Sequence, residues 1–254
     1  MPLTSFNYFS GKISSKIYFK IISYTIIFSL FQLLWNCSPT TDELVSKGVS
    51  LLDEQEYERS ITFLSRAIEK DAGNFKAVNA RGVAFFELEK FEEAISNYNQ
   101  AIKIDSFSYT AFYNRGNAKR ELKDAEGALA DYSKAISIKP NIKDIYINRG
   151  IVLYSLENYR AAKADFEFAL KLDDQDKNAY YDHAKTVLMM DSLNLAKESF
   201  EKSLIIDPEF APSLYWLGLT EISLNNKESG CRYLNKAHIL QFSEAKSALE
   251  KYCL

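Results

Sequence analysis

The stretch YTAFYNRGNAKRELKDAEGALADYSKAISIKPNI, residues 109–142, places small and large residues at spacings that predict two closely packed helices. Small residues stand at Gly116, Ala128 and Ala135, and the aromatic Tyr132 lies between the last two. Glycine within a helix costs about 0.5–1 kcal/mol relative to alanine, so its presence here needs a reason. Close approach of two helix backbones, with a large side chain filling the space between them, supplies that reason.

The same pattern recurs along the chain with a period of 34 residues. The first small column contains five glycines and one alanine: Gly48, Gly82, Gly116, Gly150, Ala184 and Gly218. Two further small columns follow: Ser60, Ala94, Ala128, Ala162, Ala196 and Gly230, then Ala67, Ala101, Ala135, Ala169, Ser203 and Ala237. A large column lies between these two: Leu64, Tyr98, Tyr132, Phe166, Phe200 and Leu234. A fixed period of this length indicates a repeat architecture.

Six units of two helices each are therefore expected, without insertion or deletion. Their boundaries are 41–74, 75–108, 109–142, 143–176, 177–210 and 211–244. In the third unit, for example, we expect helices over 109–121 and 125–138. The units end in turn-forming residues, and Pro140 and Pro208 stand where a helix must stop.

The small and aromatic columns, the helix-ending prolines and the period resemble the tetratricopeptide repeat. The resemblance implies an all-α fold, a right-handed superhelical solenoid of six helix pairs whose first helices line a concave groove. Grooves of this family bind peptides or partner helices. The chain departs from the family pattern at Ala184, which replaces glycine, and at Lys119 and Glu221, where a large apolar residue is usual.

A repeat stack needs a cap, because its last unit otherwise exposes an apolar face. Residues 245–254 are expected to form that capping helix, with Ser243 as its N-cap. Cys231 and Cys253 are ten and twelve residues from a turn near Gln241, so they reach similar heights on antiparallel helices. We predict a disulfide between them, which export would let persist. The alternative is a pair of buried thiols.

The resemblance also predicts which side chains line the groove, from the second, fifth, ninth and twelfth residues of each unit. The expected groove residues at these positions are Val83, Phe86, Tyr113, Asn117, Arg120, Ile147, Ile151, Tyr154, Tyr181 and Lys185. Asn148, at a polar position of the family's carboxylate clamp, is expected to join them. The aromatic members are expected to anchor an apolar segment of a partner protein. The two asparagines are expected to hydrogen-bond its backbone, and the two basic residues to favour acidic flanks. The alternative is that some aromatics only pack helix against helix.

Some members of the family bind a chain-terminal carboxylate through a clamp of Lys, Asn and Arg side chains. Only Asn117 and Asn148 match that clamp here. Tyr113, Asn178 and Asp182 stand where the clamp has basic groups or its other polar member. Capture of a carboxylate is therefore not expected.

The amino-terminal 36 residues have the pattern of a signal peptide. Three lysines precede the apolar run IISYTIIFSLFQLLW, residues 21–35, which is short for a helix that spans a bilayer. Leu34 lies three residues before Cys37, an arrangement that resembles the lipobox of bacterial lipoproteins, although Trp35 and Asn36 are bulkier than usual. This implies cleavage before Cys37, its acylation, and residues 37–40 as a tether. The alternatives are an uncleaved signal anchor and an unmodified cysteine.

Composition argues against several classes of function. The net charge is −3, and because the first 36 residues carry three lysines and no acid, the remainder carries −6. An acidic remainder disfavours nucleic-acid binding. The two histidines, His183 and His238, lie far apart with no metal-ligand spacing around them. We expect no metal, cofactor, small-molecule substrate or catalytic activity, since no phosphate loop or nucleophile motif is present.

The sequence thus predicts a non-catalytic protein–protein interaction scaffold in a bacterial cell envelope. A lipid anchor would hold it to a membrane, with the outer membrane favoured over the inner one. The repeats would lie in the periplasm or at the cell surface. The alternative is a structural assembly subunit whose groove is filled by self-association.

Overall fold

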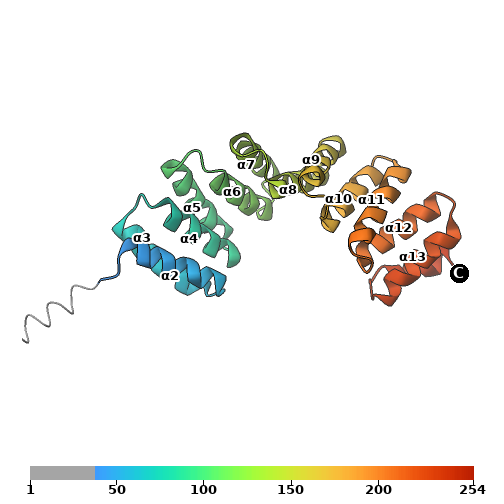
Figure 1. The fold of residues 1–254 in the computed structure, drawn as a ribbon, viewed down its shortest axis with the longest axis horizontal. Coiled ribbons are helices and arrows are strands. Elements are labelled where there is room, and N and C mark those ends of the chain that lie inside the picture. The colour runs from blue at the N-terminus through green and yellow to red at the C-terminus, as the bar shows by residue number, and fades with distance from the viewer. Residues whose placement is uncertain (1–37) are drawn as a thin grey trace, which may run out of the picture.

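A computed structural model describes residues 38–254, which form an arch built only of helices (Figure 1). The expected all-α solenoid of six helix pairs with a final capping helix is confirmed. The signal peptide and Cys37 lie outside the described residues. Within the described part, no helix is both long and apolar enough to cross a membrane.

The first helices of successive pairs begin every 34 residues. They are α2 (Thr41–Asp53), α4 (Phe75–Glu87), α6 (Tyr109–Glu121), α8 (Lys143–Ser155), α10 (Lys177–Leu188) and α12 (Ala211–Ser223). The second helices are α3 (Tyr57–Lys70), α5 (Phe91–Ile104), α7 (Ala125–Ile138), α9 (Tyr159–Leu172), α11 (Leu193–Ile206) and α13 (Lys227–Ile239). Each first helix packs against the second helix of its own pair, and successive first helices also contact each other directly.

Glycine is needed in the first small column because the large side chains of the facing helix leave no room for a Cβ atom. A Cβ atom added to Gly116 would lie 2.8 Å from Cε1 of Tyr132, and one added to Gly150 would lie 2.9 Å from Cε1 of Phe166. The rings of the large column are almost fully buried between the helices of their pair. The close backbone approach that the sequence predicts is therefore present, and it fixes how the helices of each pair cross.

The turn between the two helices of each pair uses a left-handed residue that is not glycine. In the third pair this residue is Lys123, with φ 64°. Its N–H donates to Arg120 O, and the next N–H, from Asp124, donates to Lys119 O, which together form a Schellman motif. The equivalent residues in the other five pairs are Gln55, Glu89, Glu157, Asp191 and Asn225.

An arginine series joins neighbouring repeats, and the sequence analysis did not identify it. Arg115 donates two hydrogen bonds to the Asp131 carboxylate, at 2.8 and 2.6 Å, and a third to Asn99 of the preceding repeat, at 2.6 Å. Arg149 binds Asp165 in the same two-pronged way and also reaches back to the preceding repeat. Such bidentate pairs add geometric specificity, so they help to fix the stacking of one repeat on the next.

The series is replaced in the fifth repeat by a neutral contact. His183 stands at the arginine position, and its Nδ1 lies 2.9 Å from Ser199 Oγ. Its Nε2 lies 3.8 Å from Glu167 Oε1, beyond hydrogen-bond distance, and burial lowers the pKa of the ring. This packed environment agrees with a structural role for His183.

Ion pairs accommodate the two charged departures from the family pattern. Lys119 Nζ lies 2.8 Å from Asp131 Oδ2. Glu221 is almost fully buried, and its Oε1 lies 2.9 Å from Lys197 Nζ. Each of these two charges therefore has an opposite charge beside it.

The cap is helix α14, Ala245–Tyr252, which packs against α13 through buried Ala245 and Ala248. The expected N-cap at Ser243 is wrong. The N-cap is Glu244, in a helical conformation without a side-chain capping bond, and Ser243 Oγ donates instead to the Glu244 carboxylate. The helix is entered through a tight turn in which Ala245 N–H donates to Phe242 O.

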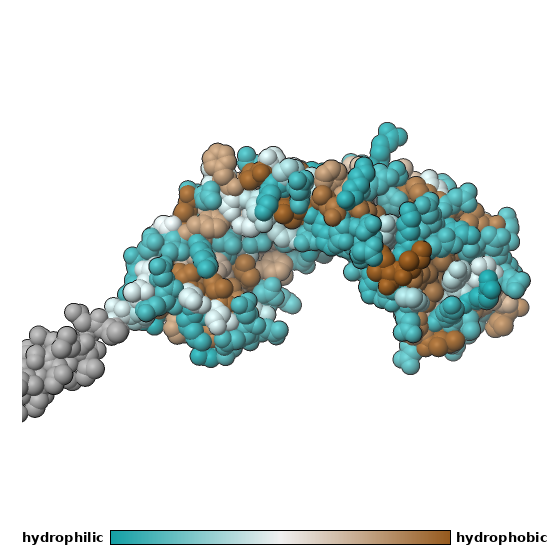
Figure 2. Space-filling view, in the orientation of Figure 1, coloured by the Kyte–Doolittle hydropathy of each residue, from teal (hydrophilic) through white to brown (hydrophobic). Residues whose placement is uncertain are grey.

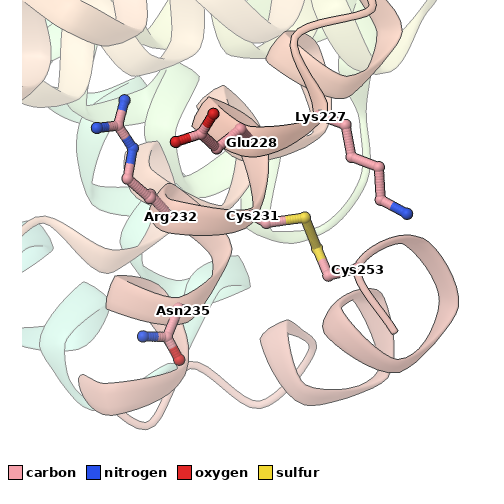
Figure 3. A pocket seen from close by; sticks show the side chains of 6 residues that line it. All are labelled: Lys227, Glu228, Cys231, Arg232, Asn235 and Cys253. Carbon is pink, nitrogen blue, oxygen red and sulfur yellow. A yellow bond between two sulfur atoms is a disulfide. The ribbon is translucent and has the colours of Figure 1, made fainter.

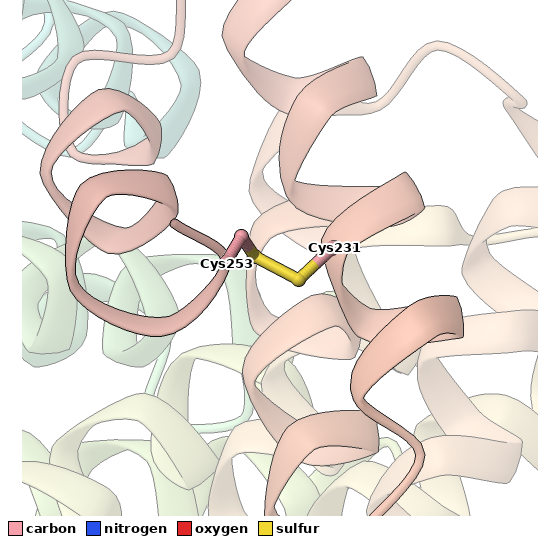
Figure 4. Close-up of a disulfide and its surroundings, with 2 residues drawn as sticks. All are labelled: Cys231 and Cys253. Carbon is pink, nitrogen blue, oxygen red and sulfur yellow. A yellow bond between two sulfur atoms is a disulfide. The ribbon is translucent and has the colours of Figure 1, made fainter.

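A disulfide ties the cap to the last repeat. Cys231 on α13 and Cys253, just after α14, are bonded, with their Cα atoms 5.8 Å apart (Figure 4). The bond closes a loop with a sequence separation of 22.

Replacing Ala128 with leucine is expected to destabilise the protein by about 1–3 kcal/mol, because the added atoms overpack a fully buried contact beside Tyr132. Urea unfolding followed by circular dichroism measures the change. Ala130→Leu is the control, since Ala130 lies on the same helix but is exposed. Equal midpoints for the two variants would contradict the packing account.

Loss of the disulfide through Cys253→Ser is expected to lower the free energy of unfolding by about 3 kcal/mol in the chain-entropy account of such a loop. Non-reducing peptide mapping should first show the linked pair in protein purified from its native host. Free thiols at both positions there, or an unchanged unfolding midpoint in the variant, would reject the prediction.

Candidate binding groove

The first helices lie on the inner side of the arch along much of its length (Figure 1). The space-filling view shows that this side is hollowed and that apolar and polar residues share its wall (Figure 2). The predicted groove residues come from four of these helices, α4, α6, α8 and α10. We call this surface the groove.

At the amino-terminal end, the predicted groove residues are partly used for packing. Val83 and Phe86 are half-buried and pack against the core formed by Ala94, Tyr98 and Ala118. Phe86 also meets Phe91 edge to face, with ring centroids 5.4 Å apart. These two side chains contribute to the wall of the groove but project little from it.

In the centre of the groove, four polar residues form one hydrogen-bonded network with the buried Tyr132. Asn148 Nδ2 donates to Tyr113 Oη at 2.9 Å and to Asn117 Oδ1 at 3.1 Å. Tyr132 Oη donates to the same Asn117 oxygen at 2.8 Å. Arg120 donates to Asn148 Oδ1 at 2.9 Å. Both N–H groups of Asn148 are thus engaged within the protein, which leaves less hydrogen-bonding capacity for a partner's backbone than the sequence analysis expected.

The charge of Arg120 is also already paired. Its Nε and NH2 groups both donate to Glu121 Oε1, at 3.2 and 2.8 Å. An acidic flank on a partner would have to compete with this carboxylate. The structure therefore gives little support to the expectation that Arg120 favours acidic segments.

Two adjoining hollows open in the groove, and Ile151 lines both. The larger, of about 440 Å³, lies between α6 and α8 and includes Arg120, Ser155 and Leu156. The smaller, of about 130 Å³, is lined by Ile151, Tyr154, Phe166, Asp182 and Lys185. Ile151 itself is 37% exposed, a large fraction for an isoleucine on a packed helix. The hollows place it where a bound segment would cover it.

Aromatic rings surround the ammonium group of Lys185. Its Nζ lies 5.4 Å from the ring centroid of Tyr154, 5.4 Å from that of Tyr181 and 6.0 Å from that of Trp216. A cation over such rings is attracted by their negative faces. Lys185 is therefore held in place by its neighbours.

The aromatic groove residues combine packing with exposure. Tyr154 meets Tyr159 edge to face at 5.4 Å, and Tyr181 meets Phe210 in the same way at 5.6 Å. Both tyrosines remain half-buried, and burial raises the pKa of each phenol. The two interpretations of these residues, anchor and packing partner, thus apply together: one side of each ring packs within the protein and part remains accessible.

Asp182 is the residue of this region that the sequence analysis did not predict as a binding residue. It lies on α10 beside Lys185 and lines the smaller hollow. Burial raises the pKa of its carboxyl group to about 6, against the opposing effect of Lys185. The signal available in the sequence was its position, where the carboxylate clamp of the family has another polar group.

A further hollow, of about 630 Å³, lies away from the groove. It is an open depression beside the disulfide, lined by residues of α13 and by Cys253 (Figure 3). Among residues 38–254, no group of three or more His, Cys, Asp or Glu side chains is arranged to hold a metal ion.

Comparison with protein families identifies the repeat. Residues 82–122 and 116–157 match a model described as a TPR repeat, and residues 143–176 match one described as a tetratricopeptide repeat. Together these matches cover residues 82–176. No curated protein sequence is similar enough to the chain to count as a relative.

Solved structures share the fold along most of their length. YrrB, described as a TPR protein with an unusual peptide-binding site, is 24% identical, with 74% of this chain and 97% of YrrB covered and a TM-score of 0.66. PilF of Pseudomonas aeruginosa is 19% identical, with 83% of this chain and 96% of PilF covered and a TM-score of 0.73. MamA of Desulfovibrio magneticus is 20% identical, with 67% of this chain and 96% of the MamA chain covered and a TM-score of 0.63. The fold is thus that of a tetratricopeptide-repeat solenoid.

Proposed function

We propose that this protein is a non-catalytic interaction scaffold that holds an apolar segment of a partner protein in its groove. The observation that carries the proposal is the pair of hollows that meet at Ile151, in the middle of the inner surface. A protein segment needs recesses along a continuous surface, because anchors that are buried in recesses supply most of the binding energy.

The anchors of this interaction are Tyr113, Ile147, Ile151, Tyr154 and Tyr181. Rings that are already held by their neighbours lose little conformational freedom when a partner covers them. YrrB, which shares the fold, has a peptide-binding site, and a peptide is the ligand class that we propose here.

We further propose that the scaffold works in a bacterial cell envelope, with Cys37 as its lipid anchor. The support comes from the sequence: three lysines, an apolar run and a cysteine directly after it. The repeats would then lie in the periplasm or at the cell surface. An oxidising compartment of this kind is also where the Cys231–Cys253 disulfide would persist.

Replacing both Tyr154 and Tyr181 with alanine is expected to weaken partner capture by tenfold or more, since each central anchor contributes more than about 1–2 kcal/mol. Affinity capture from envelope extracts with the full-length protein as bait measures this, followed by quantitative mass spectrometry. Tyr180→Ala is the matched control, because Tyr180 is the neighbouring residue on α10 but lies beside Lys202 of α11.

The groove assignment would be wrong if the double variant captured every partner as well as the wild type does, or if it unfolded while Tyr180→Ala did not. Light scattering of the purified protein tests the alternative of self-association. A concentration-independent monomer supports the scaffold, whereas a stable oligomer that the double variant dissolves supports an assembly subunit.

Metabolic labelling with an alkynyl fatty acid is expected to mark the wild-type protein and not Cys37→Ser, because the thiol and new amine of that cysteine would carry the acyl chains. Both proteins should be produced in a bacterial host and compared after export. Equal labelling of the two would exclude Cys37 as the lipidation site.

A further inference from the structure

We propose that the smaller hollow of the groove receives a basic side chain of the bound partner, with the Asp182 carboxylate as its counter-ion. The inference rests on the proposed function, because it names the chemistry of a residue in the segment that the groove holds. It is the opposite of the acidic flank that the sequence analysis expected.

The size of the hollow fits one side chain. Its volume of about 130 Å³ corresponds to roughly four water molecules at about 30 Å³ each. Pockets for drug-sized ligands and cofactors typically have about 300–1,000 Å³. A single long side chain is therefore the occupant that matches this space.

The walls of the hollow suit a side chain with an apolar stem and a charged end. Ile151, Tyr154 and Phe166 provide apolar surface, and Asp182 provides the only acid of the lining. Lysine and arginine bury their methylene stems against such surfaces and keep the charge at a polar end. The half-buried ring of Tyr154 would add attraction for a cation.

Asp182 differs from the other half-buried or buried acids on the neighbouring helices because it has no partner of its own. Asp131 and Asp165 each receive two hydrogen bonds from an arginine. Within residues 38–254, no Lys, Arg or His nitrogen lies within 4.0 Å of the Asp182 carboxylate, and no hydrogen bond to its carboxylate oxygens is found. Neither Asp182 oxygen is fully buried, so this half-buried carboxylate is unpaired and still open to an incoming cation.

Lys185 does not neutralise Asp182, although both line the same hollow. The three rings around its ammonium group hold Lys185 where it lowers the pKa of Asp182 without pairing directly. The other titratable groups that act on or respond to Asp182 are Asp176 and Tyr181 of its own helix region and Tyr154 of α8. Burial outweighs Lys185, and the pKa of Asp182 rises to about 6.

The raised pKa of Asp182 determines how binding of a cation should change with pH. Asp182 is ionised above about pH 6, so a cation should bind at neutral pH and leave as the pH falls through 6. Because the raised pKa means that ionisation opposes folding, Asp182→Asn should leave the melting temperature at pH 7.5 unchanged or higher. If Asp182 were needed only for structure, Asp182→Asn would lower the melting temperature.

The test uses the full-length protein in detergent, methyl-labelled at isoleucine, and three small probes: n-butylguanidinium, neutral butyramide and the anion pentanoate. At pH 7.5, n-butylguanidinium should shift the Ile151 methyl signal saturably and bind at least fivefold more tightly than butyramide. The shift should diminish at pH 5. Asp182→Asn should abolish the preference, whereas Asp144→Asn, at an exposed acid on α8, should retain it.

Equal or tighter binding of pentanoate, or a guanidinium preference that survives in Asp182→Asn, would overturn the proposal. Partner capture separates this failure from failure of the proposed function. If Tyr154→Ala with Tyr181→Ala loses the partner while Asp182→Asn captures it like the wild type, the groove holds a partner but the basic side chain is wrong. If neither variant loses capture, the proposed function itself is wrong.

Discussion

The contact between a residue without a side chain on one helix and a large ring on the next sets the geometry of the whole solenoid. In the central pairs, Gly116 faces Tyr132 and Gly150 faces Phe166 at distances that leave no room for a methyl group. The contact recurs at Gly82 with Tyr98, and at Gly48 and Gly218 with a leucine in place of the ring, whereas the fifth unit has Ala184. A small residue thus faces a large one at the same position of each unit. Similar pairs stacked in one direction must form a regular curve, and the first helices then face its inside (Figure 1).

The two sides of the arch use polar residues differently. Arg115 and Arg149 each form hydrogen bonds to the second helix of their own repeat and to that of the preceding repeat. Their charges are therefore paired within the fold. In the groove, the Asn117–Asn148 network is likewise internal, whereas Asp182 and the exposed face of Ile151 are not used by the fold. Functional side chains are therefore best recognised here by what the fold leaves unpaired or uncovered.

The sequence predicted the repeat, the helix pairs and the cap because the constraints that create them lie within one 34-residue unit. Gly116 and Tyr132 are only sixteen positions apart, and the column shows directly in the sequence. The Arg115–Asp131 pair has the same spacing and was open to the same reasoning. The N-cap of α14 was mispredicted at Ser243 because the chain enters that helix through a turn at Phe242, whose ring packs against Tyr215 of α12.

The groove was predicted only in part, because its chemistry depends on contacts between units. Asn148 reaches Tyr113 across 35 positions and Arg120 across 28, so the hydrogen bonds that occupy these residues cannot be seen within a single repeat. The surroundings of Asp182 depend in the same way on contacts between units, because Tyr154 and Ile151 of the preceding repeat line the same hollow. Aromatic rings of three different units surround Lys185, which also lines it. Position within the repeat located the groove residues, and the superhelix determined what each can still bind.

Photocrosslinking in living cells tests the central claim most directly. A photoreactive benzophenone amino acid placed at Ser155, which lines the larger hollow, should crosslink the full-length protein to a discrete partner. The same group at Lys134, exposed on the second helix α7, should give no such product. Crosslinks of equal yield and identity from both positions, or none from Ser155, would contradict the assignment of the groove as the binding surface.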